Sequence, residues 1–230
     1  MSSASPEPPL DSTDRLARRL RGFGPAGIVA ILIVLAGNLV FVPLSAILVL
    51  VWAHWSRTPW RQLGLARPRS WGRVIAIGVP SGILFKLVLK IVVMPLLGAP
   101  ATNARCHYLT GNTAALPLML YMVVVGAGFG EEMVFRGYLF ERMRHLLGPG
   151  RGALVLTIAV TSAFFAGAHY YDQGWPGVEQ AAVTGVVFGM IYALTRRLWI
   201  PMIAHAFFDL TAVLLIYMDR ESTLAHLLFR

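Results

Sequence analysis

Six ionisable residues in apolar parts of the chain could meet at one point and do chemistry together. They are Glu131, Glu132, Arg136, His169, His205 and Asp209. Ionisable side chains are costly inside a membrane and are by default functional there. Glu132 and Arg136 are four residues apart and can pair within one helix, which leaves Glu131, about 100° further round, free to face elsewhere. His205 and Asp209 share a helix face by the same spacing.

A buried carboxylate beside histidines suits the hydrolysis of a carbonyl compound. Glu131 could take a proton from water, which then attacks the carbonyl, while a histidine and a neighbouring donor stabilise the oxyanion. The same residue types also suit other chemistry. Glu131, His169, His205 and Asp209 have the ligand types of a catalytic zinc site. His169 and His205 could ligate a haem, and the whole set could relay protons or ions.

Some sites are excluded by the sequence, while a structural interpretation stays open. No HExxH motif occurs, which excludes a zincin helix, and no GxSxG motif occurs. A lone histidine such as His169 can merely hydrogen-bond a carbonyl, and the cluster that starts at Glu131 can be a structural ion pair. Lys86 and Lys90 lie four apart in another apolar segment, and we expect them to snorkel or to line a polar crevice.

The composition identifies the class of protein that must position these residues. Hydrophobic residues make up 57% of the 230-residue chain and charged residues 13%, against about 45–50% and about 25% in soluble domains. The net charge is +9, yet a basic nucleic-acid binder would not be this apolar, so no nucleic-acid partner is expected. The single cysteine, Cys106, excludes an intrachain disulfide framework and any CxxC site.

Apolar segments of membrane-spanning length follow one another along the chain. They cover about 27–53, 74–97, 114–140, 153–169, 178–195 and 200–218, and a span needs about 20 residues. The sequence therefore predicts an all-α polytopic integral membrane protein with about six transmembrane helices. The GPGRG break centres on Gly150, and Glu131 and His169 are each 19 residues from it. An antiparallel hairpin about this turn would place both residues at one level, well inside the bilayer.

Basic residues are unevenly distributed among the breaks between these segments. The first, third and fifth breaks hold ten arginines and the second holds one, which places the odd-numbered breaks on the cytoplasmic side. Four arginines in the N-terminal tail contradict this arrangement if 27–53 crosses the membrane once. Either Pro43 breaks that segment into a re-entrant hairpin, or the tail lies outside.

Three motifs resemble those of a known family of membrane proteases. GEEMVFRGYLF (130–140), FAGAH (165–169) and HAFFD (205–209) are similar to the EExxxR, FxxxH and HxxxN/D motifs of the CPBP family. This family contains the CAAX-protease and bacteriocin-processing membrane proteins, also called Abi, and includes the type II CAAX prenyl endopeptidases. The resemblance covers about residues 115–218, and all three motifs occur in order in successive apolar segments.

The resemblance implies a role for each motif residue. Glu131 looks like the glutamate that activates water, and Glu132 and Arg136 complete its motif and orient it. His169 matches the histidine next to the water or the scissile carbonyl. His205 and Asp209 match the oxyanion-stabilising pair, although the prenyl endopeptidases have Asn where this chain has Asp209. The family is widely labelled metalloprotease, so zinc held by Glu131, His169, His205 and Asp209 stays open beside a metal-free mechanism.

The sequence and the resemblance together define the expected protein. We expect a polar N-terminal tail (1–24), two variable membrane segments (25–113), a four-helix catalytic core (114–218) and a C-terminal tail (219–230). The expected function is that of an intramembrane endopeptidase that hydrolyses a peptide bond of a membrane-associated protein or peptide. The alternative is a non-proteolytic membrane immunity or scaffold protein of the same fold. The Arg-rich, lysine-poor chain resembles bacterial proteins, which favours the bacterial inner membrane.

Overall fold

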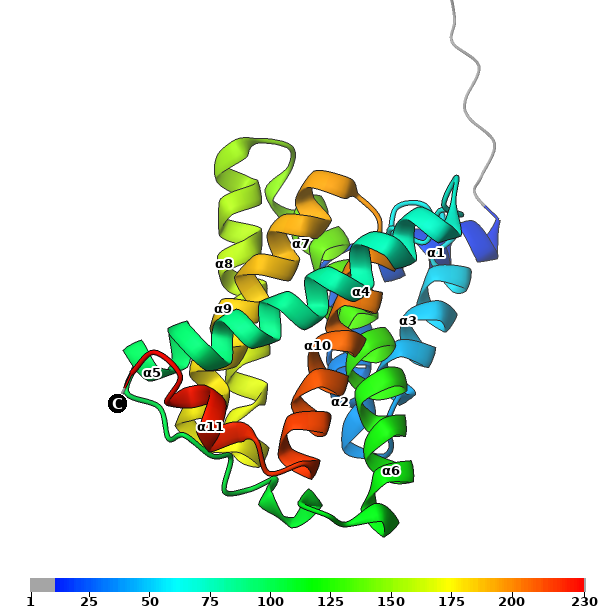
Figure 1. Cartoon of the computed structure of the whole chain (residues 1–230). Coiled ribbons are helices and arrows are strands. Elements are labelled where there is room, and N and C mark those ends of the chain that lie inside the picture. Colours follow the sequence, from blue (N-terminus) through cyan, green and yellow to red (C-terminus); the bar gives the residue numbers. More distant parts are fainter. Residues whose placement is uncertain (1–10, 230) are drawn as a thin grey trace, which may run out of the picture.

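Five helical segments are long and apolar enough to cross a membrane. A computed structural model describes residues 11–229, and no strand occurs among them. The five segments are Trp71–Leu96, Thr113–Leu147, Arg151–Ala168, Tyr170–Thr195 and Trp199–Tyr217 (Figure 1). The predicted all-α polytopic fold is therefore confirmed.

The long segments are not uniform helices. The first consists of α4 (Trp71–Val88), a wide π-type turn (Leu89–Val93) and α5 (Met94–Leu96). The second consists of a 3₁₀ turn (Thr113–Ala115), α6 (Leu116–Tyr121), two π-type stretches (Met122–Glu131 and Met133–Leu139) and α7 (Phe140–Leu147). The other three are α8 (Arg151–Ala168), α9 (Tyr170–Thr195) and α10 (Trp199–Tyr217), and the short α11 (Glu221–Ala225) follows. Gly174, at φ 67°, bends the start of α9.

The first apolar segment does not cross the membrane as one helix. It forms α2 (Pro25–Ala36) and α3 (Leu44–Trp55), which are packed together and joined by a turn at residues 37–43. Asn38 and Ser45 close this turn, because each backbone N–H donates to the side-chain oxygen of the other residue at 2.9 Å. The expectation of a single span over 27–53 is therefore wrong. The hairpin alternative, with the break at Pro43, is confirmed.

The N-terminal tail contains a further helix that is docked on the bundle. α1 (Ser12–Arg21) is capped by Asp11, whose carboxylate accepts from the backbone N–H of Ser12 at 2.6 Å. The indole N–H of Trp52 in α3 donates to the Leu20 carbonyl at 3.2 Å. α1 and the following α2 differ in direction by 63°, and counting this bent pair as one span would raise the number of candidate spans to six. Residues 1–10 of the predicted tail lie outside the described residues.

α10 is the central helix, and small residues let its neighbours approach its backbone. It packs against α4, α9 and the stretch Met122–Glu131. A Cβ added at Gly82 of α4 would lie 2.1 Å from the Ala204 carbonyl oxygen, and one added at Gly128 would lie 2.7 Å from the Ala206 Cβ. Both contacts fall on the part of α10 that carries His205. The close approach of three segments therefore positions the candidate catalytic residues.

Candidate active site

A cavity of about 740 Å³ lies among the membrane-spanning segments. Its walls include side chains from α4, α8, α9, α10 and the π-type stretch that ends at Glu131. Residues 99–109 and α11 cover it at one end. Its polar lining residues include Lys86, Lys90, Glu131, His169, Gln180, His205, Asp209 and Glu221. The cavity therefore brings together residues that are far apart in the sequence.

Glu132 and Arg136 form a buried ion pair behind the cavity wall. Glu132 is fully buried, and its Oε1 accepts from Arg136 Nη1 at 2.6 Å. The same oxygen accepts from His205 Nδ1 at 2.8 Å. The Arg136 guanidinium lies 4.6 Å from the centroid of the Phe165 ring and also donates to the Gly185 carbonyl at 3.3 Å. Glu132 thus fixes the imidazole of His205 through Nδ1, whereas the sequence predicted that Glu132 orients Glu131.

The other nitrogen of His205 faces two carboxylates. Its Nε2 lies 3.8 Å from Glu131 Oε2 and 3.5 Å from Asp209 Oδ2. Glu131 Oε2 is buried and has no hydrogen-bond partner within the described residues. Since a polar contact longer than about 3.5 Å is often bridged by water, a water molecule could bind between Glu131 and His205. The predicted arrangement of the two glutamates is present, because Glu132 pairs with Arg136 and leaves Glu131 facing the cavity.

His169 ends α8 at the cavity wall, as the turn about Gly150 predicts. Its Nδ1 lies 2.8 Å from the Phe165 carbonyl oxygen. A carbonyl only accepts, so Nδ1 carries the proton, and the Nε2 of a neutral ring is left as an acceptor. The ring centroid lies 4.6 Å from that of Phe165, which fixes the ring from one side. His169 therefore offers an acceptor to a water molecule or a substrate N–H, whereas His205 has an acceptor beside each of its nitrogens.

The structure brings all six predicted site residues together. Glu131, His169, His205 and Asp209 line the cavity, and Glu132 and Arg136 support it from behind. The helix that carries the first motif has π-type turns on both sides of Glu132. Such turns often occur at functional sites. No periodicity in the sequence indicated them.

Two further polar pairs line the cavity. The Lys86 ammonium donates to Gln180 Oε1 at 2.8 Å, and Lys90 forms an ion pair with Glu221 at 2.9 Å. The expectation that the lysines line a polar crevice is confirmed. Their partners, Gln180 and Glu221, were not predicted from the sequence. Glu221 also accepts from the backbone N–H of Asn103 at 3.1 Å, and its place in the polar C-terminal tail offered no signal of such a role.

The zinc interpretation can be tested against the arrangement of the donors. The proposed ligands have suitable chemistry, since they are imidazoles and carboxylates. Among residues 11–229, however, no three His, Cys, Asp or Glu side chains are arranged to hold a metal ion. The side chains as they stand do not fit a bound metal.

The segment that carries the site is similar in sequence to known proteases. Residues 113–211 match the family described as type II CAAX prenyl endopeptidase Rce1-like. The membrane-embedded CAAX protease MroQ of Staphylococcus aureus (strain USA300) is 25% identical over 130 residues, which are 56% of this chain and 51% of that protein. The chain thus spans about half the length of the curated relative that it matches. No solved structure matches the chain. The matched segment contains all six site residues.

Proposed function

Because residues 113–211 match the type II CAAX prenyl endopeptidase Rce1-like family and part of the chain is similar to a CAAX protease, we propose that this membrane protein is an intramembrane endopeptidase of the CPBP type. It hydrolyses a peptide bond of a membrane-associated protein or peptide, and Glu131 activates the attacking water. We expect it in the bacterial inner membrane. The observation that supports the proposal best is the unpartnered Glu131 oxygen, 3.8 Å from the Nε2 of a histidine that Glu132 fixes through Nδ1.

The chain's own side chains can supply each step of the hydrolysis. Glu131 takes a proton from water, and the resulting hydroxide attacks the carbonyl carbon of the scissile bond. His205, when its Nε2 carries a proton, donates to the oxyanion that forms. The tetrahedral intermediate collapses, the C–N bond breaks, and Glu131 returns its proton to the leaving amine. His169, with Nε2 as an acceptor, orients the water or the N–H of the scissile peptide.

Asp209 supports the role of His205 in the proposed reaction. Its Oδ2 lies 3.5 Å from His205 Nε2, so an ionised Asp209 favours a protonated imidazole by simple charge attraction. A protonated imidazole is a stronger donor to an oxyanion than a neutral one. Asp209 stands where the prenyl endopeptidases have Asn. It can therefore act through His205 and need not contact the oxyanion directly.

A comparison of two glutamate variants tests the proposal. The purified protein in proteoliposomes is incubated with a library of membrane-derived peptides, and new chain ends are counted by mass spectrometry. Glu131→Gln keeps the shape of the side chain and removes the base, so cleavage should fall by about 10²–10⁴-fold. Glu179→Gln is the matched control, because Glu179 lies outside the cavity wall. Equal cleavage by Glu131→Gln and the unaltered protein would refute the proposal.

The dependence on metal is measured in the same assay. The metal content of the purified protein is determined, and cleavage is compared before and after strong chelation. The donor arrangement predicts that chelation leaves the cleavage rate unchanged. Stoichiometric zinc together with loss of cleavage on chelation would contradict the metal-free reaction and make the four cavity residues zinc ligands.

A further inference from the structure

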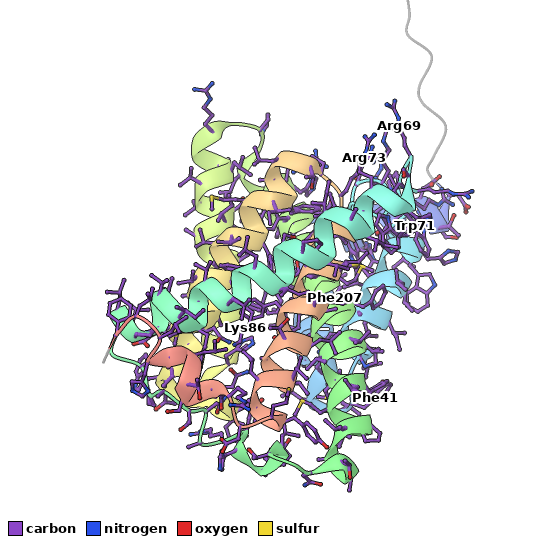
Figure 2. All side chains as sticks on the ribbon, in the orientation of Figure 1. Phe41, Arg69, Trp71, Arg73, Lys86 and Phe207 are labelled. Carbon is purple, nitrogen blue, oxygen red and sulfur yellow. The ribbon has the colours of Figure 1, made fainter. Side chains whose placement is uncertain are left out.

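Arginines from four separate parts of the chain gather at one end of the bundle. These parts are α1, the segment from Arg57 to Arg73, the region of the α7–α8 turn and the α9–α10 turn. The arginines are Arg15, Arg18, Arg19, Arg21, Arg57, Arg61, Arg67, Arg69, Arg73, Arg142, Arg144, Arg151, Arg196 and Arg197. Figure 2 shows Arg69 and Arg73 at the start of α4, with Lys86 further along the same helix towards α5. We name this end the basic end.

Direct contacts join the four parts of the basic end. Arg57 pairs with Asp14 and donates to Thr13 Oγ1 at 2.8 Å, which ties the segment after α3 to α1. In α7, Arg142 donates to the Arg21 carbonyl at 2.6 Å. The backbone N–H of Leu198, in the α9–α10 turn, donates to the Gly64 carbonyl at 3.0 Å. The four arginine-rich parts of the chain therefore lie together at the basic end.

At the opposite end, the catalytic cavity is bordered by the segment 97–112, which we call the strap. The Asn103 N–H donates to Glu221 of α11, and the Gly111 N–H donates to the Tyr217 carbonyl at the end of α10 at 3.0 Å. Arg105 of the strap donates to the Tyr171 carbonyl at the start of α9. Outside the candidate spans, the described basic residues at this end are Arg105 and Arg220.

The cavity reaches the strap end and not the basic end. The strap residues Ala104, Arg105 and Tyr108 line the cavity and are exposed. No described residue of α1, of the segment 56–73 or of the two turns at the basic end lines it. A peptide can therefore reach the lining residues His169 and Asp172 from beside the strap.

If the segment 27–53 crossed the membrane once, the N-terminal arginines would lie on the side opposite the arginines of the first loop. The hairpin of α2 and α3 removes this conflict. α2 leaves the basic end and α3 returns to it, because α1 contacts both Trp52 and Arg57 near the end of α3. The N-terminal arginines and the first loop are consequently on one side of the membrane. Five further spans then place the α7–α8 and α9–α10 turns on that side and the strap, the start of α9 and α11 on the other.

We propose that the basic end is cytoplasmic and that the catalytic cavity opens on the extracytoplasmic side, so that the substrates are peptide segments presented on that side. Arginine and lysine near the ends of spans set orientation by remaining in the cytoplasm. Counted outside the candidate spans at both ends, the described residues include ten arginines at the basic end against two at the strap end, which is a strong bias for one orientation. The substrate class rests on the proposed peptidase function, whereas the orientation rests on the charges and contacts alone.

Single-cysteine labelling of the full-length protein in intact cells tests the orientation. In a Cys106→Ser background, Ala104→Cys and His107→Cys place exposed thiols on the strap, and Gln62→Cys and Pro149→Cys place exposed thiols at the basic end. A membrane-impermeant maleimide is applied before and after the cells are permeabilised. Each variant is first shown to react in detergent. We expect the two strap positions to react in intact cells and the two basic-end positions to react only after permeabilisation.

The other patterns overturn the proposal. If the basic-end positions react in intact cells and the strap positions do not, the cavity opens to the cytoplasm. Reaction at all four positions in intact cells, or at none, contradicts the single orientation that the charges predict. Because the labelling needs no catalysis, a protein that reacts as expected but cleaves no peptide would refute the peptidase function and leave the orientation standing.

Discussion

Gly82 lies where α4 contacts the backbone of α10, and its replacement by alanine should push the two helices apart. A Cβ at this position would lie 2.1 Å from the Ala204 carbonyl oxygen and 3.0 Å from the Phe208 backbone nitrogen. An ordinary contact begins at 3.4 Å, so a separation of about 1.3 Å is needed. The obstacle is backbone, which cannot rotate out of the way as a side chain can.

The size of the effect follows from this displacement. Overpacking costs about 1–3 kcal/mol, and the higher helix propensity of alanine offsets about 1 kcal/mol. Because the clash is with backbone, we expect the upper end of the range, a net loss of about 2 kcal/mol. This corresponds to a fall of about 4–8 °C in the melting temperature of a protein of this size. His205 follows Ala204 on α10, and a misplacement of about 1 Å can cost about 10²-fold in rate.

Melting temperature and cleavage rate in detergent are measured for Gly82→Ala and for Gly72→Ala. Gly72 lies in the first turn of α4, and a Cβ there would meet only Ser70 Oγ at 3.8 Å. The control should therefore keep the cleavage rate and melt at the same temperature or slightly higher. If Gly82→Ala behaves like Gly72→Ala, the inference that contact between α4 and α10 positions His205 is wrong.

Three further perturbations have expected outcomes. Arg136→Met leaves the buried Glu132 without its cation and should lower the free energy of unfolding by about 3–5 kcal/mol, as measured by thermal unfolding. An unchanged melting temperature would contradict the inference that this buried ion pair stabilises the fold. Glu221→Gln removes the ion-pair partner of Lys90 and should speed amide hydrogen exchange in the strap by about tenfold or more. This corresponds to a free energy of local opening that is lower by at least about 1.4 kcal/mol. Exchange as slow as in the unaltered protein would show that this ion pair does not hold the strap. Burial raises the pKa of the Cys106 thiol, so its thiolate fraction at pH 8 is below that of an exposed thiol. The rate of alkylation of Cys106 should therefore keep rising with pH above the ordinary thiol pKa. An alkylation rate that levels off at the ordinary thiol pKa would refute the raised pKa.

Local spacing predicted the parts of the site that depend on one helix. Glu132 and Arg136, and likewise His205 and Asp209, are i, i+4 pairs whose geometry follows from helix pitch. The equal spacing of Glu131 and His169 about Gly150 predicted one level for both residues, because two antiparallel helices joined by a short turn must lie side by side. These inferences required no knowledge of tertiary packing.

Contacts between distant segments could not be predicted in this way. The hydrogen bond from His205 to Glu132 joins residues 73 positions apart, and the ion pair of Lys90 with Glu221 joins residues 131 apart. Hydropathy marks 27–53 as one apolar stretch, because it does not register the backbone reversal that Pro43 and the Asn38 cap produce. Pro43 indicated the break, but the docking of α3 on α1 depends on the contact between Trp52 and Leu20, which are 32 positions apart.

The rate of a single turnover in water enriched in ¹⁸O tests the role of Glu131 most directly. A peptide identified from the library is mixed with an excess of the purified protein, and the ¹⁸O content of the new carboxylate is followed with time. We expect one ¹⁸O atom to enter the new carboxylate. Its incorporation should be about 10²–10⁴-fold slower in Glu131→Gln and should keep the unaltered rate in Glu179→Gln. Incorporation by Glu131→Gln at the rate of the unaltered protein would contradict the account.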